Sequence, residues 1–265
     1  MHGVKTIEIS RESLKKEKVE LADAHCHLNM LDEGAVADSV AAGVTVMVTN
    51  GGSTGANMEV LKRADGKHVF AAVGIGPDEA MVIDDDEVNF NIQLAKDNRD
   101  KIVGIGEIGL DYEIASSFER VAAQKTVFKK FVDLALELDL PVSVHSRKAM
   151  DDVLRILKEE GARKVHLHFF EGDAAQAKVA AERGYYVSVP PMESSKRSNA
   201  IKHVPIEQIM SESDAPAAGS LPKDVERSVV IIAKSKAIEY QKAAEVTVAN
   251  TRRFFNIGKQ NLIRL

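Results

Sequence analysis

Hydrophobic residues in this chain gather into short runs rich in β-branched side chains, with polar breaks and longer mixed segments between them. Such runs predict strands that are buried on both faces, because those strands read as nearly continuous hydrophobic stretches. Eight runs recur along the chain, at residues 19–25, 44–49, 68–75, 101–107, 140–146, 164–169, 185–190 and 208–213. The chain is therefore expected to repeat a buried strand eight times.

The intervals between the runs predict helices, at residues 33–42, 56–65, 87–98, 117–138, 148–160, 174–183, 194–203 and 223–237. The pattern is clearest in 117–138, where apolar side chains return at helical spacing and form one stripe. That stripe consists of Val121, Phe128, Phe131, Val132, Ala135 and Leu138. Pro141 follows it, and proline stops a helix because it has no N–H to donate.

Strands that alternate with helices predict an α/β fold with a parallel sheet. Eight such units in 265 residues fit a closed (β/α)8 barrel of the TIM type better than a doubly wound open sheet, which is the alternative. We expect a single barrel domain over residues 21–265, preceded by a polar extension at 1–20. The last segment, 241–256, predicts a helix that closes the barrel.

Composition narrows the class of protein. Aromatic residues make up 5% of the chain and tryptophan is absent, so aliphatic side chains must fill the interior. The formal net charge of −5 argues against a broad basic surface that would bind along duplex DNA regardless of sequence. A compact phosphate site stays open, because a few local cations are enough for it.

Three features that the sequence lacks, a disulfide pair, a secretory signal and a membrane-spanning stretch, indicate where in the cell the protein is found. The single cysteine, Cys26, cannot form an intramolecular disulfide, as is typical of the reducing cytoplasm. Residues 1–20 contain no apolar core of a secretory signal. The longest nearly apolar stretch, residues 39–48, is shorter than the ~20 residues that a membrane-spanning helix needs. We therefore expect a cytoplasmic protein outside the membrane, of unspecified oligomeric state.

Five of the eight predicted strands end in a side chain that can bind a metal ion. These side chains are His25 with His27, Glu107, His145, His168 and Asp214. The carboxyl ends of barrel strands meet at one face of the fold, so the set predicts a shared site. Imidazole and carboxylate ligands together suit zinc, manganese, iron or cobalt.

Strand alternation orients the first pair of histidines. His25 and His27 are two residues apart and point the same way, so both can reach one ion. Cys26 between them then faces the packed side of the strand. A His-x-His pair alone is a weak signal, and the interpretation depends on the other strand ends.

Position along the strand separates two further pairs of candidates. His166 shares a face with His168, but His168 lies nearer the strand end and so nearer the mouth. We expect His166 to be a deeper, hydrogen-bonded core histidine. The same argument ranks Asp214 over Glu212.

These motifs resemble the TatD family of metal-dependent hydrolases, within the amidohydrolase-like barrels, from about Leu21 to Ile257. The resemblance rests on "DAHCHL", "GEIGLDY", the helix from Gln124 to Phe128, "LPVSVHSR", "HFFEG", "ESDAP" and "NTRRFF", in that order. It implies hydrolysis with one or two divalent metal ions, zinc, magnesium or manganese. In the two-ion form the ligands are His25, His27 and Asp214 for one ion, His145 and His168 for the other, and Glu107 between them.

The resemblance also implies roles in catalysis. Asp214 and Glu107 are the expected catalytic carboxylates, with Asp214 the general base toward a metal-activated water. Asp23 is expected to orient a ligand histidine rather than to bind metal. Arg147, two residues after His145, is placed to hold an anionic oxygen, because a guanidinium fork matches a phosphate. Its alternative role is a surface salt bridge at the start of a helix.

Two positions depart from the family pattern. Gly76 stands where members carry a histidine, and Glu171 stands where they carry a serine.

The predicted function is deoxyribonuclease-like cleavage of phosphodiester bonds, with a nucleic-acid end as substrate. The departures favour an alternative on the same metal site, hydrolysis of a small amide or ester such as an aminoacyl ester, because a glutamate repels phosphate. A barrel that binds metal without catalysis is the remaining alternative.

Overall fold

The computed structural model describes residues 19–258. Residues 1–18 of the predicted polar extension and residues 259–265 of the predicted domain lie outside the described residues. The limits of the two predicted regions therefore stay a prediction. Among residues 19–258, no helix is long and apolar enough to cross a membrane.

The described chain alternates strands with helices, as the hydrophobic pattern predicts. The strands are β1 (Leu21–Cys26), β2 (Val44–Gly52), β3 (Val69–Ile75), β4 (Ile102–Asp111), β5 (Val142–Arg147), β6 (Val165–Leu167), β7 (Tyr186–Val189) and β8 (Ile209–Ser211). The α-helices are α1 (Gly34–Ala42), α2 (Thr54–Arg63), α3 (Asp85–Asp97), α4 (Phe118–Glu137), α5 (Met150–Glu159), α6 (Ala174–Glu182), α7 (Ser195–Ile201), α8 (Val225–Lys236) and α9 (Tyr240–Phe254). Short 3-10 turns are η2 (Leu28–Met30), η3 (Glu79–Met81), η4 (Ile206–Gln208), η5 (Ala217–Gly219) and η6 (Pro222–Asp224).

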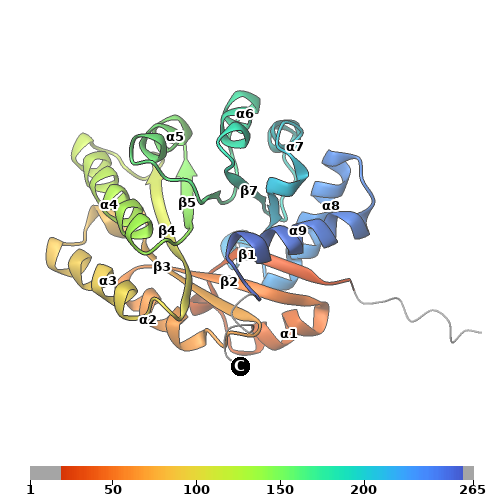
Figure 1. The fold of residues 1–265 in the computed structure, drawn as a ribbon, viewed down its shortest axis with the longest axis horizontal. Helices are drawn as coiled ribbons and strands as arrows, with labels where there is room; N and C mark the ends of the chain where they lie inside the picture. Colours follow the sequence, from red (N-terminus) through yellow and green to blue (C-terminus); the bar gives the residue numbers. More distant parts are fainter. Residues whose placement is uncertain (1–18, 259–265) are drawn as a thin grey trace, which may run out of the picture.

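All eight strands form one parallel sheet in sequence order, β1 to β8, with helices outside it (Figure 1). This order confirms the predicted barrel and excludes the doubly wound sheet, in which the strand order reverses. No ladder joins β8 to β1 in the described part of the chain, and hydrogen bonds close the seam instead. Ser211 Oγ donates to the Ala22 carbonyl at 2.8 Å, and the Asp214 N–H donates to the His25 carbonyl at 2.9 Å.

The predicted apolar stripe on the longest helix is confirmed. Phe128, Phe131 and Val132 of α4 are buried against the barrel, whereas the end residues Val121 and Leu138 are half-buried. The helix begins at Ser117, whose side chain accepts a hydrogen bond from the Arg120 N–H, as an N-cap serine does. The local sequence thus fixes both where this helix begins and which face it turns to the sheet.

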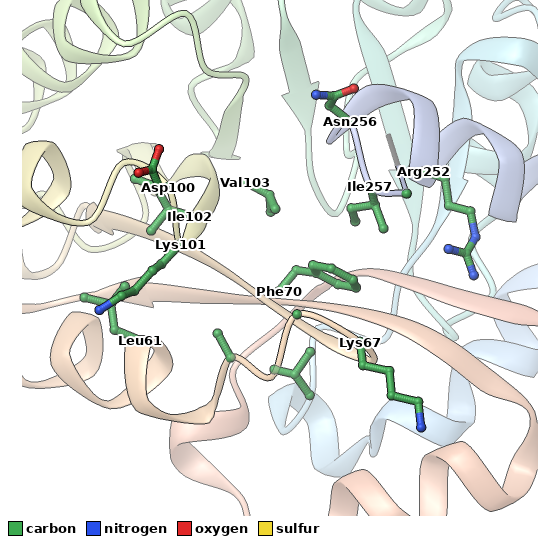
Figure 2. A pocket seen from close by; sticks show the side chains of 14 residues that line it. Leu61, Lys67, Phe70, Asp100, Lys101, Ile102, Val103, Arg252, Asn256 and Ile257 are labelled. Carbon is green, nitrogen blue, oxygen red and sulfur yellow. The ribbon is translucent and has the colours of Figure 1, made fainter. Parts of the chain in front are cut away.

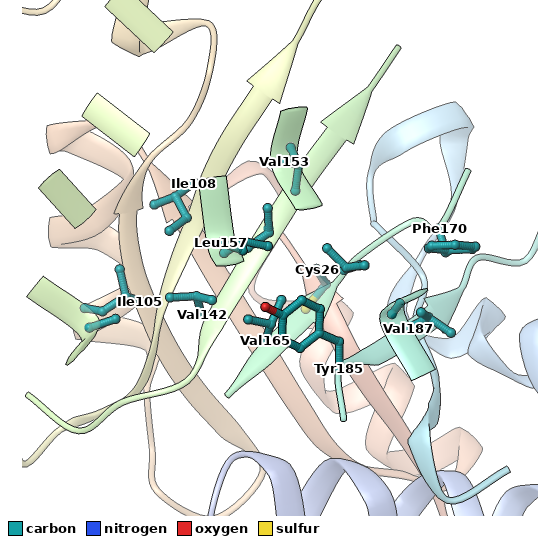
Figure 3. Packing of buried hydrophobic residues seen from close by; sticks show 14 of the residues in the cluster. Cys26, Ile105, Ile108, Val142, Val153, Leu157, Val165, Phe170, Tyr185 and Val187 are labelled. Carbon is teal, nitrogen blue, oxygen red and sulfur yellow. The ribbon is translucent and has the colours of Figure 1, made fainter. Parts of the chain in front are cut away.

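Two buried clusters fill the fold. The larger lies between the sheet and the helices and includes Cys26, Val165 and Leu157 (Figure 3). Cys26 therefore faces the packed side, as strand alternation predicts. The smaller cluster includes alanines and valines of β1 and β2 together with Val248 and Phe255 at α9. The predicted closing helix is confirmed, because α9 covers this inner cluster.

The fourth strand differs from its prediction. β4 runs past Glu107 to Asp111, so the expectation that Glu107 ends this strand is wrong. The strand continues because Gly109, at φ +142°, lets the backbone pass close to β5. A Cβ at that position would lie 2.1 Å from the His145 carbonyl oxygen, so only glycine fits. Glu107 nevertheless lines the mouth of the barrel.

Candidate metal centre

The six side chains predicted as metal ligands converge at the carboxyl end of the barrel. Within the described residues they form two groups, in each of which one ligand atom per residue lies within 4.8 Å of the others. The groups are His25 with His27 and Asp214, and Glu107 with His145 and His168. Their division matches the two ion sites that the resemblance implies.

Glu107 stands between the two groups and turns one carboxylate oxygen to each. Oε2 lies 3.2 Å from His27 Nε2 and 3.7 Å from His25 Nε2. Oε1 lies 2.8 Å from His145 Nδ1 and 3.0 Å from His168 Nε2. A carboxylate that bridges two cations needs this placement of its oxygens.

Asp214 completes the first group from the segment after β8. Its Oδ1 lies 3.5 Å from His27 Nε2 and 3.7 Å from His25 Nε2. Burial acts to raise the pKa of Asp214, but the hydrogen bond with His27 and the nearby His168 outweigh it and lower the pKa. The side chain is therefore an ionised acceptor at neutral pH.

The histidines respond differently to the same carboxylates. Burial lowers the pKa of His25 to about 3, so this imidazole is neutral. Burial also acts to lower the pKa of His27 and of His145, but Asp214 and Glu107 beside His27 raise its pKa to about 10. Asp111 and Glu107 likewise raise the pKa of His145 to about 10. A metal ion must therefore displace protons from these two rings.

The outer nitrogens of the histidines are held by groups that the sequence reasoning did not assign. His27 Nδ1 lies 3.1 Å from the Asn50 carbonyl oxygen, and His145 Nε2 lies 3.2 Å from Asp111 Oδ2. Such contacts fix the orientation of a metal-binding imidazole. Asp111 stands in the "GEIGLDY" motif, so that motif carried a signal for it, whereas nothing in the local sequence marks Asn50.

Asp23 is fully buried but does not touch an imidazole. Its Oδ1 accepts from the His25 N–H at 3.3 Å and from the Ser213 N–H at 2.9 Å, and its Oδ2 accepts from Ser213 Oγ. Burial raises the pKa of Asp23 to about 7. It therefore ties β1 to the segment before Asp214 through the backbone, and any orienting effect on His25 is indirect.

Glu212, which the sequence reasoning ranked below Asp214, lies deeper in the same region. It is fully buried and forms a third candidate group with His25 and His168. Its Oε2 is 3.8 Å from His168 Nδ1, a buried nitrogen without a hydrogen-bond partner in the described structure. Burial, with the Asp214 carboxylate nearby, raises the pKa of Glu212.

The residues present fit a divalent metal. Nitrogen and oxygen donors converge within metal-ligand reach of one another, and several donors are buried. The unpartnered Nδ1 of His168 is an orphaned buried donor or acceptor of the kind that a ligand or ion satisfies. Imidazole and carboxylate together suit zinc or manganese.

Two cavities open above this cluster. The first, about 530 Å³, is lined by His27, Glu107 and Asp214 and extends to Gly76 and Asp78. Glu79 also lines it, and among the described residues around it there is no lysine or arginine.

The second cavity, about 320 Å³, shares His145, His168 and Asp214 with the first and extends to Arg147 and Glu171. Arg147 is exposed and forms no ion pair with any described residue, but after Lys148 it also helps to lower the pKa of Glu113. Both roles expected for Arg147 stay predictions. Glu171 is also exposed at this cavity, so it does not point away from the mouth. The first cavity therefore has acidic side chains but no lysine or arginine at its edge, whereas the second has the guanidinium of Arg147.

A separate cavity of about 520 Å³ lies at the opposite end of the barrel (Figure 2). Phe70, Val103 and Ile257 line it, with lysine and arginine side chains at its edges. Among its described lining residues Asp100 is the only carboxylate, and there is no histidine or cysteine. The base of the barrel thus lacks the ligand set found at the mouth.

The family model described as TatD related DNase matches residues 22–256 of this chain. The chain belongs to the TatD family. The human relative named "Deoxyribonuclease TATDN3" is 30% identical over 261 residues, which cover 89% of this chain and 95% of that protein. The Bacillus subtilis "Uncharacterized metal-dependent hydrolase YabD" is 31% identical over 90% of this chain and 100% of its own length. The crystal structure of the TatD homologue YjjV from Escherichia coli matches with a TM-score of 0.82 at 25% identity, covering 90% of this chain and 99% of that one.

TatD membership confirms the resemblance stated from the motifs. It also confirms the predicted class, a metal-dependent hydrolase of the deoxyribonuclease-like TatD type, and leaves the non-catalytic barrel without support. The cluster at the mouth is the natural place for that metal.

Proposed function

We propose that this TatD protein cleaves phosphodiester bonds of DNA at a pair of divalent ions held at the barrel mouth. The observation that carries the proposal is the position of Glu107, whose two oxygens face two separate ligand groups. In this proposal His25, His27 and Asp214 hold one ion and His145 and His168 hold the other, as the sequence motifs imply. The relatives named as deoxyribonucleases support DNA as the substrate. The histidine-rich set favours zinc or manganese over magnesium, which prefers oxygen ligands.

The chain's own residues divide the work of hydrolysis. Metal ions held by the two ligand groups would supply hydroxide at neutral pH and would polarise a phosphoryl oxygen. Asp214, ionised at neutral pH, accepts the proton of the attacking water. Glu107 holds the two ligand groups at a fixed separation, and Arg147 binds a non-bridging phosphate oxygen from the edge of the smaller cavity. We place this activity in the cytoplasm, which the single buried thiol of Cys26 supports.

The proposal is tested by metal content together with DNA cleavage. Protein stripped with a chelator and reloaded with Zn²⁺, Mn²⁺ or Mg²⁺ is assayed on end-labelled single-stranded DNA. The expected result is metal-dependent cleavage and about two ions per chain. A protein that binds metal but leaves DNA intact with all three ions contradicts the DNA substrate.

One observation favours a second substrate, a small ester or amide such as an aminoacyl ester. The larger cavity presents Asp78 and Glu79 and, among the described residues, no lysine or arginine. These carboxylates repel a phosphate but attract the ammonium group of an aminoacyl ester.

Asp78→Asn separates the two substrates. If the substrate is DNA, removing a negative charge beside the phosphate lowers KM for DNA. If it is an aminoacyl ester, the same change raises KM for the ester. The matched control is Asp38→Asn, an exposed position on α1 remote from the mouth.

A further inference from the structure

Beneath the proposed metal centre, five buried side chains form a continuous line of hydrogen bonds, which we call the relay. It runs from His25 through Ser143, His166 and Ser188 to Glu212, and each of the five is 0% exposed. The successive distances are 3.0 Å (His25 Nδ1 to Ser143 Oγ), 3.2 Å (Ser143 Oγ to His166 Nδ1), 2.6 Å (His166 Nε2 to Ser188 Oγ) and 2.8 Å (Ser188 Oγ to Glu212 Oε2). Water has no access to these groups, so they must satisfy one another.

The relay is built by strand register. Ser143 of β5 lies directly opposite His166 of β6 in the parallel ladder. Ser188 lies in β7 and Glu212 directly follows β8, so the relay crosses neighbouring strands inside the barrel. At its far end Glu212 Oε1 accepts from the Phe169 N–H at 2.6 Å, which fixes the orientation of the carboxyl group.

The relay has only two possible directions, because each neutral imidazole has one donor and one acceptor nitrogen. His166 is fully buried between the hydroxyl groups of Ser143 and Ser188 and contacts no carboxylate through either ring nitrogen, so it takes part in the relay as a neutral imidazole. His25 must likewise be neutral to bind a metal. If Glu212 accepts from Ser188, then Ser188 accepts from His166 Nε2–H, and His166 Nδ1 accepts from Ser143. Ser143 must then accept from His25 Nδ1–H.

That direction leaves the lone pair of His25 on Nε2, the nitrogen that faces His27, Glu107 and Asp214. The opposite direction places a proton on Nε2, where it blocks metal binding. We propose that Glu212 is a positioning residue that acts as the terminal acceptor of the relay and thereby holds His25 in its metal-binding tautomer. The inference rests on the proposed function, because it takes His25 as a ligand.

The acceptor role explains a carboxylate in an otherwise costly place. Glu212 is fully buried and forms no ion pair with a described lysine or arginine. Each of its carboxyl oxygens meets a donor, Oε1 the Phe169 N–H at 2.6 Å and Oε2 the Ser188 hydroxyl at 2.8 Å, so the buried group is satisfied as an acceptor.

Glu212→Gln tests the direction of the relay with little change in shape. The Phe169 N–H needs an acceptor, so the amide oxygen must face it and the amide NH2 must face Ser188. The amide then donates to Ser188, and the whole relay turns round. We expect zinc affinity to fall by about 10–100-fold, the usual loss when the partner of a ligand histidine is changed.

The tautomer of His25 is the direct readout. Long-range ¹H–¹⁵N spectra of the zinc-loaded full chain distinguish Nδ1–H from Nε2–H, and the His25 signal is assigned by its loss in His25→Gln. We expect Nδ1–H in the wild type and a shift toward Nε2–H in Glu212→Gln. The matched control is Glu182→Gln, an exposed position at the end of α6, which leaves both the tautomer and the zinc affinity unchanged.

A double-mutant cycle shows whether the effect travels through Ser188. Ser188→Ala interrupts the relay, so Glu212→Gln in that background should cost little further zinc affinity. Additive losses, or a His25 tautomer that Glu212→Gln leaves unchanged in a folded, zinc-binding protein, overturn the relay while the metal-dependent hydrolysis stands. A wild type that binds no metal and cleaves nothing refutes the proposed function instead, and the two failures are thus distinct.

Discussion

The imidazole rings of His25 and His168 are stacked face to face, with centroids 3.7 Å apart and planes inclined by 3°. In the proposed two-ion arrangement the two rings serve different ions, and both also lie in the third group with Glu212, so the stack joins the proposed ion sites. A buried ring against another ring is costly to charge, and burial together with His168 lowers the pKa of His25 to about 3. The stack therefore keeps His25 neutral, which is the form that binds metal.

Asp214→Asn is expected to lower kcat for DNA by about 10²–10⁴-fold, because asparagine keeps the shape but cannot take the water's proton. Single-turnover cleavage measures the effect, and circular dichroism checks the fold. Asp38→Asn on the exposed face of α1 is the control for the chemical change. A wild-type rate in the Asp214 variant removes this residue as the base.

Glu107→Gln is expected to remove one of the two proposed ions. An amide offers one good oxygen donor, whereas both Glu107 oxygens face ligand groups, Oε2 at 3.2 Å from His27 Nε2 and Oε1 at 2.8 Å from His145 Nδ1. Elemental analysis after dialysis gives the metal content per chain. If Glu107→Gln retains both ions and full activity, Glu107 does not bridge them. Glu182→Gln is the control for the chemical change.

Metal binding is expected to release about two protons per chain at pH 7, because imidazole must be neutral to ligate. The pKa values of His27 and His145 are raised to about 10, so both rings hold a proton at neutral pH until a metal displaces it. Metal affinity therefore rises with pH and levels off above about pH 10. Calorimetry in two buffers of different ionisation enthalpy counts the protons, and a binding heat independent of the buffer contradicts the prediction.

Arg147→Ala is expected to raise KM for DNA by about tenfold or more, the loss of one charge-assisted hydrogen bond to a phosphate, with a smaller change in kcat. Arg147→Lys should recover part of the affinity, since it keeps the charge but not the fork. Steady-state kinetics on single-stranded DNA measure both variants. Arg227→Ala, at an exposed position of α8, is the control, and an unchanged KM in Arg147→Ala removes this residue from the substrate site.

Phe255→Ala is expected to lower the free energy of unfolding by about 3–5 kcal/mol, because it leaves a cavity in the inner cluster that α9 covers. Phe255 is 2% exposed, whereas its neighbour Phe254 is half-buried, so Phe254→Ala should cost less. Urea denaturation compares the two. Equal losses contradict the account of α9 as the closure of the barrel.

Local periodicity was enough to predict the strands and helices, and a position near a strand end was enough to predict the six candidate ligands. The predicted end of the fourth strand at Glu107 shows where such local reasoning fails. The run after it contains Gly109 and reads as a break, yet the strand continues to Asp111 because that glycine passes against β5. Asp111, the partner of His145, was missed for the same reason.

The relay could not be predicted from the sequence at all. Ser143 and Ser188 are isolated polar residues within apolar strands, and nothing in the sequence marks them. His166 is the buried, hydrogen-bonded histidine that the sequence predicts, but its partners could not be predicted. Their contact depends on register between strands, which places Ser143 opposite His166. Periodicity within one strand carries no information about its offset from the next, so only the assembled sheet shows the connection.

The seam between β1 and the segment after β8 has a consequence for the order in which the enzyme is made. Ser213 donates to Asp23 across 190 residues of sequence, and the Asp214 N–H donates to the His25 carbonyl beside it. A ribosome adds about 5–20 residues per second, so Ser213 is synthesised on the order of 10–40 s after Asp23. During that time the nascent chain lacks Asp214, the proposed base, so we expect the proposed activity to begin only after the last strand has docked.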